Sequence, residues 1–420
     1  MEAPGLSERL ALANMLKTMI GSGVLTLPWA CAQFGLVASV VGLFGLAWLT
    51  MAGIALVTRC AYGLRELGDP ELDKLVGNGA GRRRDDGGKL LAERESTWEF
   101  VSFGAFGRRG KMATLLLLGA AQVGVSASYC DYVVATLEAW GLGAAPAFVA
   151  ATSCLALLSL LRSFRSIAWF SAAALVVYAY VLGLVFFYST AADDDDDGGL
   201  GRFALLFARP AGLGAFFGPA LYCFEGIGTA ISIHDAMVPP GVGGAAAADA
   251  RQAFSNVLTR TYVATFAVYV AVAACSIASW GYQVQEVILY SLPENGLRAS
   301  AQDALAVVLA FSFVLQMQPV HEIAEANLAP LVPRKCWPLT RVLLVALVSG
   351  LARAVPDMRR MVALTGAVSF AAIGFVLPAA FFLKLKRRED RHKKDDLLCA
   401  GLLFVGTVGG TWGLVAALRT

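Results

Sequence analysis

Eleven apolar stretches, most of them long enough to cross a bilayer as a helix, recur along the 420 residues of the chain. A spanning helix needs about 20 mostly apolar residues, and these runs are continuous, which excludes a strand-based barrel. Hydrophobic residues make up 57% and charged residues 15% of the chain, a composition that excludes a soluble enzyme, a disordered chain and a nucleic-acid-binding protein. We therefore predict an all-α polytopic membrane protein with about 11 transmembrane helices. The predicted spans are 10–34, 36–58, 111–140, 145–161, 166–189, 213–237, 254–280, 302–324, 338–352, 360–383 and 397–417.

The distribution of positive charge predicts the orientation of these spans. If the N-terminus is cytoplasmic, most of the 34 lysines and arginines fall on the cytoplasmic side, as the positive-inside rule requires. The stretch 62–110 is rich in glycine and charge and is predicted to be a flexible cytoplasmic loop. No segment has the size of a soluble domain, so residues 1–420 are predicted to form one transmembrane domain.

Two predicted spans, the first and the sixth, are interrupted by glycine near their middle. The first contains residues 21–23 (Gly-Ser-Gly), and the sixth contains residues 224–228 (Phe-Glu-Gly-Ile-Gly). Glycine weakens a helix by about 1 kcal/mol relative to alanine, and the backbone groups that it frees are tolerated in a membrane only where they line a cavity or bind something. Inverted repeats of five helices place broken helices at these two matching positions. Ordinary packing of small residues between helices is the alternative.

Three motifs carry a resemblance to a known family. Residues 14–30, NMLKTMIGSGVLTLPWA, resemble the first-helix signature of the amino acid/auxin permease family. The FEGIG motif with the Met-Pro segment at 237–240 is similar to the proton-coupled amino acid transporter branch, and FSFVLQMQPVHEIAE (311–325) is similar to the vacuolar branch. The resemblance implies an eleven-helix transporter of the amino acid–polyamine–organocation superfamily with a 5+5 inverted repeat. It also implies amino acid substrates, usually coupled to protons and in some branches to sodium.

The two interruptions predict where an amino acid binds. Half-helix N-termini attract a carboxylate, and freed carbonyls attract cations. We expect the substrate carboxylate at the first break and its amino group at the second. The predicted binding residues are Gly21, Ser22, Gly23, Phe224, Glu225, Gly226, Ile227 and Gly228, with Thr18, Ser126, Tyr129 and Ser312 as weaker candidates.

Ionisable residues inside a membrane are candidates for function because burying them is costly. Glu225 lies beside the second break and is the first candidate for a proton carrier; the alternative is a structural acid that holds the unwound backbone. Asp131 is the second candidate; its two alternatives are to take part in a proton relay and to balance the charge of a buried partner. Glu322 is the third, next to His321, although a partly wet interfacial cluster is the alternative there. His234 departs from the acidic pair common near this point in the proton-coupled branch.

The coupling ion follows from the types of side chain available. Sodium sites use hydroxyl and carbonyl oxygens, and the eighth span offers only Ser312 as a hydroxyl, so we expect protons rather than sodium. No P-loop or metal-binding motif occurs, and we expect no cofactor, no metal and no enzymatic activity.

The sequence therefore predicts a secondary active transporter of neutral amino acids that works by proton symport and alternating access. The alternative is an amino-acid sensor that signals through the 62–110 loop with little flux. The expected partners are an amino acid and the lipid bilayer, without nucleic acid; the oligomeric state is not readable. The plasma membrane and the vacuole or lysosome both remain open as locations.

Overall fold

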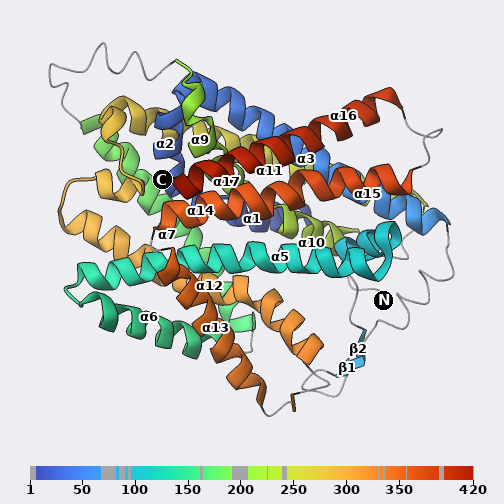
Figure 1. The fold of residues 1–420 in the computed structure, drawn as a ribbon, viewed down its shortest axis with the longest axis horizontal. Helices are drawn as coiled ribbons and strands as arrows, with labels where there is room; N and C mark the ends of the chain where they lie inside the picture. The colour runs from blue at the N-terminus through green and yellow to red at the C-terminus, as the bar shows by residue number, and fades with distance from the viewer. Residues whose placement is uncertain are drawn as a thin grey trace.

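The fold is an elongated bundle of helices that run side by side along its long axis (Figure 1). It is a computed structural model that describes every residue except 1–5, 68–81, 85–89, 93–95, 161–163, 192–206, 225, 239–243, 329–331, 334–335, 356, 387–391 and 420. The two chain ends lie toward opposite ends of the bundle in Figure 1, as an odd number of crossings requires.

The helices in chain order are α1 (Glu8–Met19), α2 (Gly23–Phe34), α3 (Leu36–Leu67), α5 (Thr97–Ala139), α6 (Ala144–Ser159), α7 (Phe164–Ala191), α9 (Leu213–Cys223), α10 (Ile227–Met237), α11 (Gly244–Trp280), α12 (Gly296–Leu328), α13 (Trp337–Ala354), α14 (Met358–Thr365), α15 (Leu377–Leu385), α16 (Lys393–Phe404) and α17 (Gly410–Arg419). Short 3-10 turns precede α9 (η1, Pro210–Gly212) and follow α11 (η2, Gly281–Gln283, and η3, Ile288–Ser291). Three wider π-helical segments join α14 to α15 (η5, Gly366–Phe370, and η6, Ala372–Val376) and α16 to α17 (η8, Val405–Gly409).

These helices confirm the predicted fold class. Within the described residues, nine helical segments are long and apolar enough to span a membrane, or ten when the bent pair α1 and α2 counts as one span. The shorter apolar helix α6 falls at the predicted fourth span. Each of the eleven predicted spans therefore corresponds to a helix or to a broken pair of helices.

The expected flexible loop 62–110 is shorter than predicted. Its first residues continue α3, and residues 97–110 form the start of α5, which bends at Gly107 with φ 64°. Trp98 and Val101, spaced three residues apart, bury one face of this first part, and the Trp98 ring meets Phe381 edge-on at 6.4 Å. Ser96 caps the helix by accepting the N–H of Glu99. Between the two helices, the strands β1 (Arg82–Arg84) and β2 (Leu90–Ala92) pair antiparallel; the other residues of the predicted loop lie outside the described ones.

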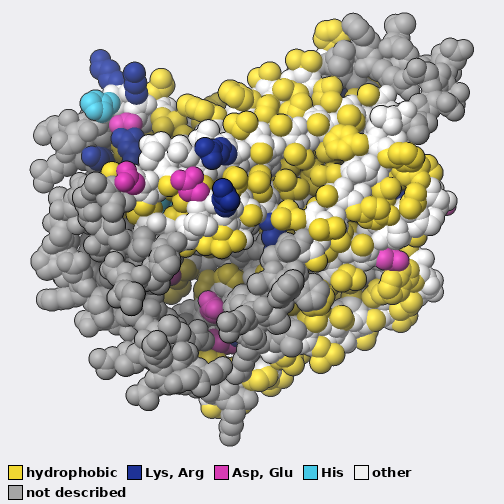
Figure 2. Space-filling view, turned by 180° about the vertical axis from the view of Figure 1, so that it is seen from behind, with side chains coloured by type: hydrophobic (Ala, Val, Ile, Leu, Met, Phe, Trp, Pro, Cys, Tyr) yellow, Lys and Arg dark blue, Asp and Glu magenta, His cyan; other side chains and the backbone are white. Residues whose placement is uncertain are grey.

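The surface shows how the bundle sits in its surroundings. On the face drawn in Figure 2, apolar side chains cover most of the described surface, whereas Lys, Arg and His side chains gather mainly toward one end. Large apolar residues such as Val41, Phe44 and Leu347 are more than half exposed. A continuous apolar exterior of this kind is suited to lipid rather than to water.

Glycine allows α9 to approach the middle of the tenth span backbone to backbone. A methyl group on Gly218 would lie 2.4 Å from the carbonyl oxygen of Ala363, and one on Gly366 would lie 1.9 Å from the carbonyl oxygen of Gly218. The obstructing atoms belong to the backbone and cannot rotate away. This contact holds the first half of the broken sixth span against α14 and η5.

Replacement of Gly218 by alanine is therefore expected to lower the free energy of unfolding by roughly 1–3 kcal/mol, because the two backbones must separate. Gly45→Ala is the matched control, since a methyl group there meets nothing within 4 Å and alanine favours a helix. The measurement is unfolding of the purified protein in mixed micelles titrated with SDS. Equal effects of the two substitutions would contradict the packing argument.

Candidate functional site

The two interrupted spans meet at their breaks. The first span is interrupted between α1 and α2, which are bent by 54°, and the sixth between α9 and α10. A methyl group on Gly23 would lie 3.0 Å from the Cys223 Sγ, and one on Gly226 would lie 2.9 Å from the Met19 Cγ. Any larger residue at these positions would force its neighbours on the other span to shift. The two predicted interruptions are thus confirmed and lie against each other, but they are shorter than predicted: Gly23 already belongs to α2, and Ile227 and Gly228 already belong to α10.

The first break leaves backbone donors without backbone partners. The N–H groups of Val24 and Leu25 turn back onto the carbonyls of Gly21 and Ser22, at 3.4 and 3.1 Å. The N–H groups of Ser22 and Gly23 make no hydrogen bond to the backbone of any described residue. They stand at the N-terminus of α2, where the helix dipole is positive, and both residues are fully buried. Such a position favours an anionic group.

A chain of three hydroxyl groups joins the break to a neighbouring helix. The Tyr222 hydroxyl lies 3.2 Å from the Ser22 Oγ and 3.0 Å from the Ser128 Oγ. Ser22 belongs to the first break, Tyr222 to α9 and Ser128 to α5, and all three are buried. Sequence reasoning missed Tyr222 and Ser128; the only local signal was that Tyr222 precedes the second break by two residues.

The remaining predicted site residues fall into different positions. Phe224 is fully buried directly after α9, and a methyl group on Gly228 would lie 3.8 Å from the Leu118 Cδ2 of α5. Glu225 lies outside the described residues, and of Ile227 only the helical backbone is described. Among the weaker candidates, Ser126 and Tyr129 are buried on α5, Ser312 is half-buried on α12, and Thr18 donates to the carbonyl of Asn14 at 2.9 Å.

A polar cluster closes the end of the bundle that carries the start of α1, called here the N-terminal face. His234 of α10 contacts the Tyr62 hydroxyl through its Nε2 and the Asp235 carboxylate through its Nδ1, the latter at 3.1 Å. Asp235 also accepts hydrogen bonds from the backbone N–H of Thr97, at 2.9 Å, and from its hydroxyl. Arg251 of α11 lies 3.7 Å from the centre of the Tyr62 ring. His234, which stands near the position of an acidic pair in the proton-coupled branch, is thus the centre of a network that joins four helices.

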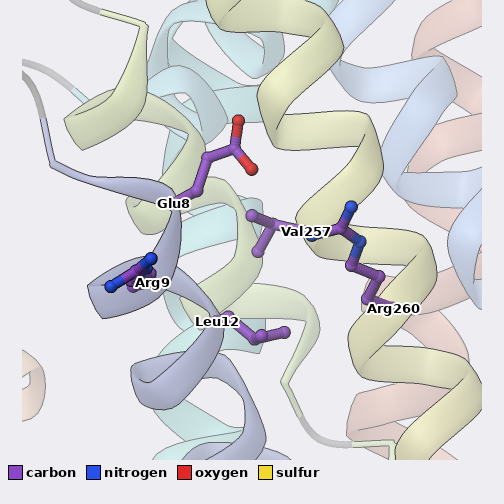
Figure 3. Close-up of a pocket in the computed structure, with 5 residues that line it drawn as sticks. All are labelled: Glu8, Arg9, Leu12, Val257 and Arg260. Carbon is purple, nitrogen blue, oxygen red and sulfur yellow. The ribbon is translucent and has the colours of Figure 1, made fainter.

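A cavity of about 310 Å³ opens on the same face between α1 and α11. In Figure 3, Glu8 and Leu12 of α1 and Val257 and Arg260 of α11 line it from its two sides. The residues just before α1 are held beside α10 by a hydrogen bond from the Leu6 N–H to the Ala236 carbonyl, at 3.1 Å. The N-terminal face is therefore partly open beside α1.

The predicted cluster at 321–325 separates into three environments. Glu322 is exposed and accepts a hydrogen bond from Gln318 at 3.1 Å. Glu325 is buried and pairs with Arg341 of α13 at 2.7 Å, while Arg341 also donates to the Ser159 carbonyl. His321 is 1% exposed, and neither of its ring nitrogens has a hydrogen-bond partner among the described residues.

A second charged cluster lies at the opposite face, around Arg359 of α14. Its guanidinium is 3.1 Å from a Glu286 carboxylate oxygen, 3.0 Å from Asp357 and 4.7 Å from the centre of the Trp29 ring of α2. Asp131 of α5 approaches this cluster and accepts the backbone N–H of Met358. The cluster joins the second half of the first span, the loop before α12 and the start of the tenth span.

In the described part of the chain, no group of three or more His, Cys, Asp or Glu side chains is placed to hold a metal ion. The site consists of backbone groups, hydroxyls and aromatic rings, flanked at each end by a charged cluster. This arrangement is suited to binding a small polar molecule.

Comparison with known proteins agrees with this geometry. The family described as "Transmembrane amino acid transporter protein" matches residues 5–418. The chain belongs to this family. It is 24% identical to the amino acid transporter ANT1 of Arabidopsis thaliana over 97% of this chain and 92% of that protein. It is 25% identical to the vacuolar amino acid transporter 3 of Saccharomyces cerevisiae over 75% of this chain and 41% of that protein.

The solved structures support the fold. The inward-facing conformation of Mhp1 superposes with a TM-score of 0.54 at 12% identity, covering 100% of this chain and 93% of that chain. This likeness confirms the predicted fold class with broken first and sixth spans. The resemblance drawn from residues 14–30 is confirmed as well, and the named relatives are transporters rather than enzymes.

The hydroxyl chain predicts a difference between two buried tyrosines. Tyr222→Phe removes the group that bonds to Ser22 and Ser128, so it should lower the free energy of unfolding by about 1–2 kcal/mol. The control is Tyr132→Phe on α5, whose hydroxyl is buried without a partner among the described residues and whose loss should be neutral or stabilising. Unfolding of both variants in mixed micelles measures the difference. A larger loss of unfolding free energy in Tyr132→Phe than in Tyr222→Phe would refute the role of the three linked hydroxyl groups.

The Arg359 cluster predicts a dependence on pH. Burial, and then the negative charge of Asp357, raise the pKa of Glu286 above its ordinary value. Since the pair with Arg359 requires the ionised carboxylate, it should break at milder acidity than an exposed pair. Hydrogen exchange of the amides in residues 286–292, corrected for intrinsic rates, should therefore rise as the pH falls from 7 to 5.

Glu286→Gln is the control for this measurement, because it lacks the ionisable group. Its exchange should be fast at both pH values and match that of the acidified wild type. A pH response of the same size in Glu286→Gln would contradict the assignment to Glu286.

Proposed function

We propose that this protein is a secondary active transporter of neutral amino acids, driven by protons and working by alternating access. The observation that carries the proposal is the contact between the two helix breaks. There, buried N–H donors at the start of α2 lie next to the carbonyl ends of α1 and α9. A zwitterion has the matching charges: its carboxylate suits the donors, and its ammonium group suits the carbonyls.

The substrate class follows from the surroundings of the breaks. We place the carboxylate at the N–H groups of Ser22 and Gly23 and the ammonium group at the carbonyls around Phe224. Tyr222 and Ser128 beside these groups are uncharged, and Glu225 carries no charge while it holds the coupled proton. A charged substrate side chain would be desolvated there without compensation, which favours neutral amino acids. The named relatives are amino acid transporters.

Alternating access requires closures at both ends of the site. The His234 cluster on the N-terminal face joins α3, α5, α10 and α11, and the Arg359 cluster on the opposite face joins α2 to α14. Both consist of hydrogen bonds and ion pairs, which are individually weak. We propose that they break in turn as the broken spans rock against α5 and α12. The positive-inside rule makes the N-terminal face cytoplasmic, and the membrane is that of the cell surface or the vacuole.

Proton coupling rests on Glu225 and on the scarcity of sodium ligands. Glu225 stands in sequence between Phe224 and Gly226, both of which are buried at the breaks. A carboxyl group can take up and release a proton, and at this position in the sequence it could carry the coupled proton. Ser312, the one hydroxyl-bearing residue in the predicted eighth span, is half-buried.

The test is uptake of a labelled neutral amino acid into proteoliposomes that contain the full chain, with a proton gradient or a sodium gradient imposed. We expect accumulation with the proton gradient only, abolished by a protonophore. Glu225→Gln should lower proton-driven accumulation at least tenfold while retaining exchange of internal for external substrate, because exchange needs no net proton movement. Glu322→Gln is the matched control and should transport normally, since Glu322 is exposed.

The contrary outcomes separate the parts of the proposal. Accumulation driven by sodium would overturn proton coupling and leave amino acid transport. Normal proton-driven uptake by Glu225→Gln would remove Glu225 as the carrier. Saturable binding without flux in either gradient would contradict transport itself.

A further inference from the structure

One side chain contacts both helix breaks at once. The hydroxyl of Tyr269, in α11, lies 2.5 Å from the carbonyl oxygen of Met19 and 2.7 Å from the carbonyl oxygen of Cys223. Met19 is the last residue of α1 and Cys223 is the last residue of α9. Tyr269 is fully buried. One hydroxyl group therefore bridges two helix ends that are about 200 residues apart in the chain.

The chemistry of the two carbonyls makes this contact unusual. The last carbonyls of a helix have no partner within the helix and carry the negative end of its dipole. Two such ends converge on the same oxygen atom of Tyr269, and buried carbonyls that lack a donor are costly in a membrane. The Met19 carbonyl also accepts the Gly21 N–H at 2.9 Å, a bond within the first break that does not reach the second. A tyrosine hydroxyl has a single hydrogen, so the two carbonyls share it. Their separation is thereby limited by the reach of one hydrogen-bonding group.

We infer that Tyr269 is a positioning residue that holds the carbonyl ends of both broken spans at a fixed separation, and that it thereby sets the affinity for the substrate's amino group. The inference rests on the proposed function for its second half only. The first half, fixation of the two breaks, is independent of transport. Because α11 also supplies one wall of the cavity on the N-terminal face, the contact links the breaks to that helix.

The same helix offers a matched control. Tyr262 lies seven residues earlier on α11, and its ring stacks on the ring of Phe224 with the centres 5.7 Å apart. The Tyr269 ring meets the same Phe224 edge-on, also at 5.7 Å. The Tyr262 hydroxyl is buried and has no hydrogen-bond partner among the described residues. The two tyrosines thus share helix, burial and aromatic neighbour, and differ in the bonds of the hydroxyl.

The experiment compares the full-length protein in lipid nanodiscs with Tyr269→Phe and Tyr262→Phe. Hydrogen exchange of the peptides that cover residues 19–24 and 223–228 measures the order of the breaks. We expect both peptides to exchange at least tenfold faster in Tyr269→Phe than in the wild type, and no change in Tyr262→Phe. In proteoliposomes the KM of Tyr269→Phe for a neutral amino acid should rise about tenfold with a nearly constant maximal rate, as expected when about one hydrogen bond is lost from the bound state.

A third variant keeps the proposal testable if Tyr269→Phe folds poorly. Incorporation of 4-aminophenylalanine at position 269 preserves the shape of tyrosine and supplies two N–H donors, one for each carbonyl. It should restore slow exchange at both breaks and a KM close to that of the wild type. If Tyr269→Phe fails to fold, whereas the 4-aminophenylalanine variant and Tyr262→Phe both fold normally, the result would support the role of Tyr269 in holding the two carbonyl ends.

Two results would overturn the inference. Equal exchange at the breaks in Tyr269→Phe and Tyr262→Phe would show that the hydroxyl does not hold them. Faster exchange in Tyr269→Phe with an unchanged KM would overturn the link to the amino group. If the wild type takes up no amino acid under any gradient, the proposed function fails, whereas the exchange measurement still decides whether Tyr269 fixes the breaks.

Discussion

The arrangement of the protein depends on one constraint: backbone groups released inside a membrane must find partners within the protein. Two spans of this chain are interrupted in their middle, and each interruption releases donors and acceptors. The breaks are placed together, so that the tyrosine hydroxyls of α9 and α11 reach both. Tyr222 bonds to Ser22, and Tyr269 bonds to the carbonyls of Met19 and Cys223. The N–H groups of Ser22 and Gly23 at the start of α2 remain without backbone partners among the described residues, and they are the groups to which we propose that the substrate carboxylate binds.

The contacts across the site are of a strength that suits movement. Hydroxyl bonds such as that between Tyr222 and Ser128 contribute about 1 kcal/mol each, and the charged clusters at the two faces are partly exposed, so water screens them. By contrast, Gly218 packs against the backbone of Ala363 with no room for a methyl group, and the pair of Glu325 with Arg341 is buried, so that water does not screen it. The molecule therefore combines firmly packed parts with interfaces that can separate at low cost.

Sequence reasoning located the breaks but not the side chains that complete them. Gly21, Ser22, Gly23 and Gly226 could be found because glycine pairs in an apolar run are a local pattern. Ser128 and Tyr269 carried no such pattern, since a serine or tyrosine in an apolar helix looks the same whether its hydroxyl reaches a break or not. For Glu322 the sequence left a proton carrier and a partly wet interfacial cluster as alternatives, because exposure is not a property of consecutive residues; in the fold its side chain is exposed.

The sequence by itself determined the membrane-spanning class, the number of spans, the two interruptions and the family, because apolar length and glycine motifs are properties of consecutive residues. Only the tertiary structure decided which distant groups meet: Tyr269 with Met19 and Cys223, His234 with Tyr62, and Arg359 with Trp29. The start of α5 also became clear only there, since its buried face needed Phe381 to pack against. The physical reason is that hydrogen bonds and ring contacts act over a few ångströms, and the packing of helices, rather than their spacing in the chain, decides which groups come within that range.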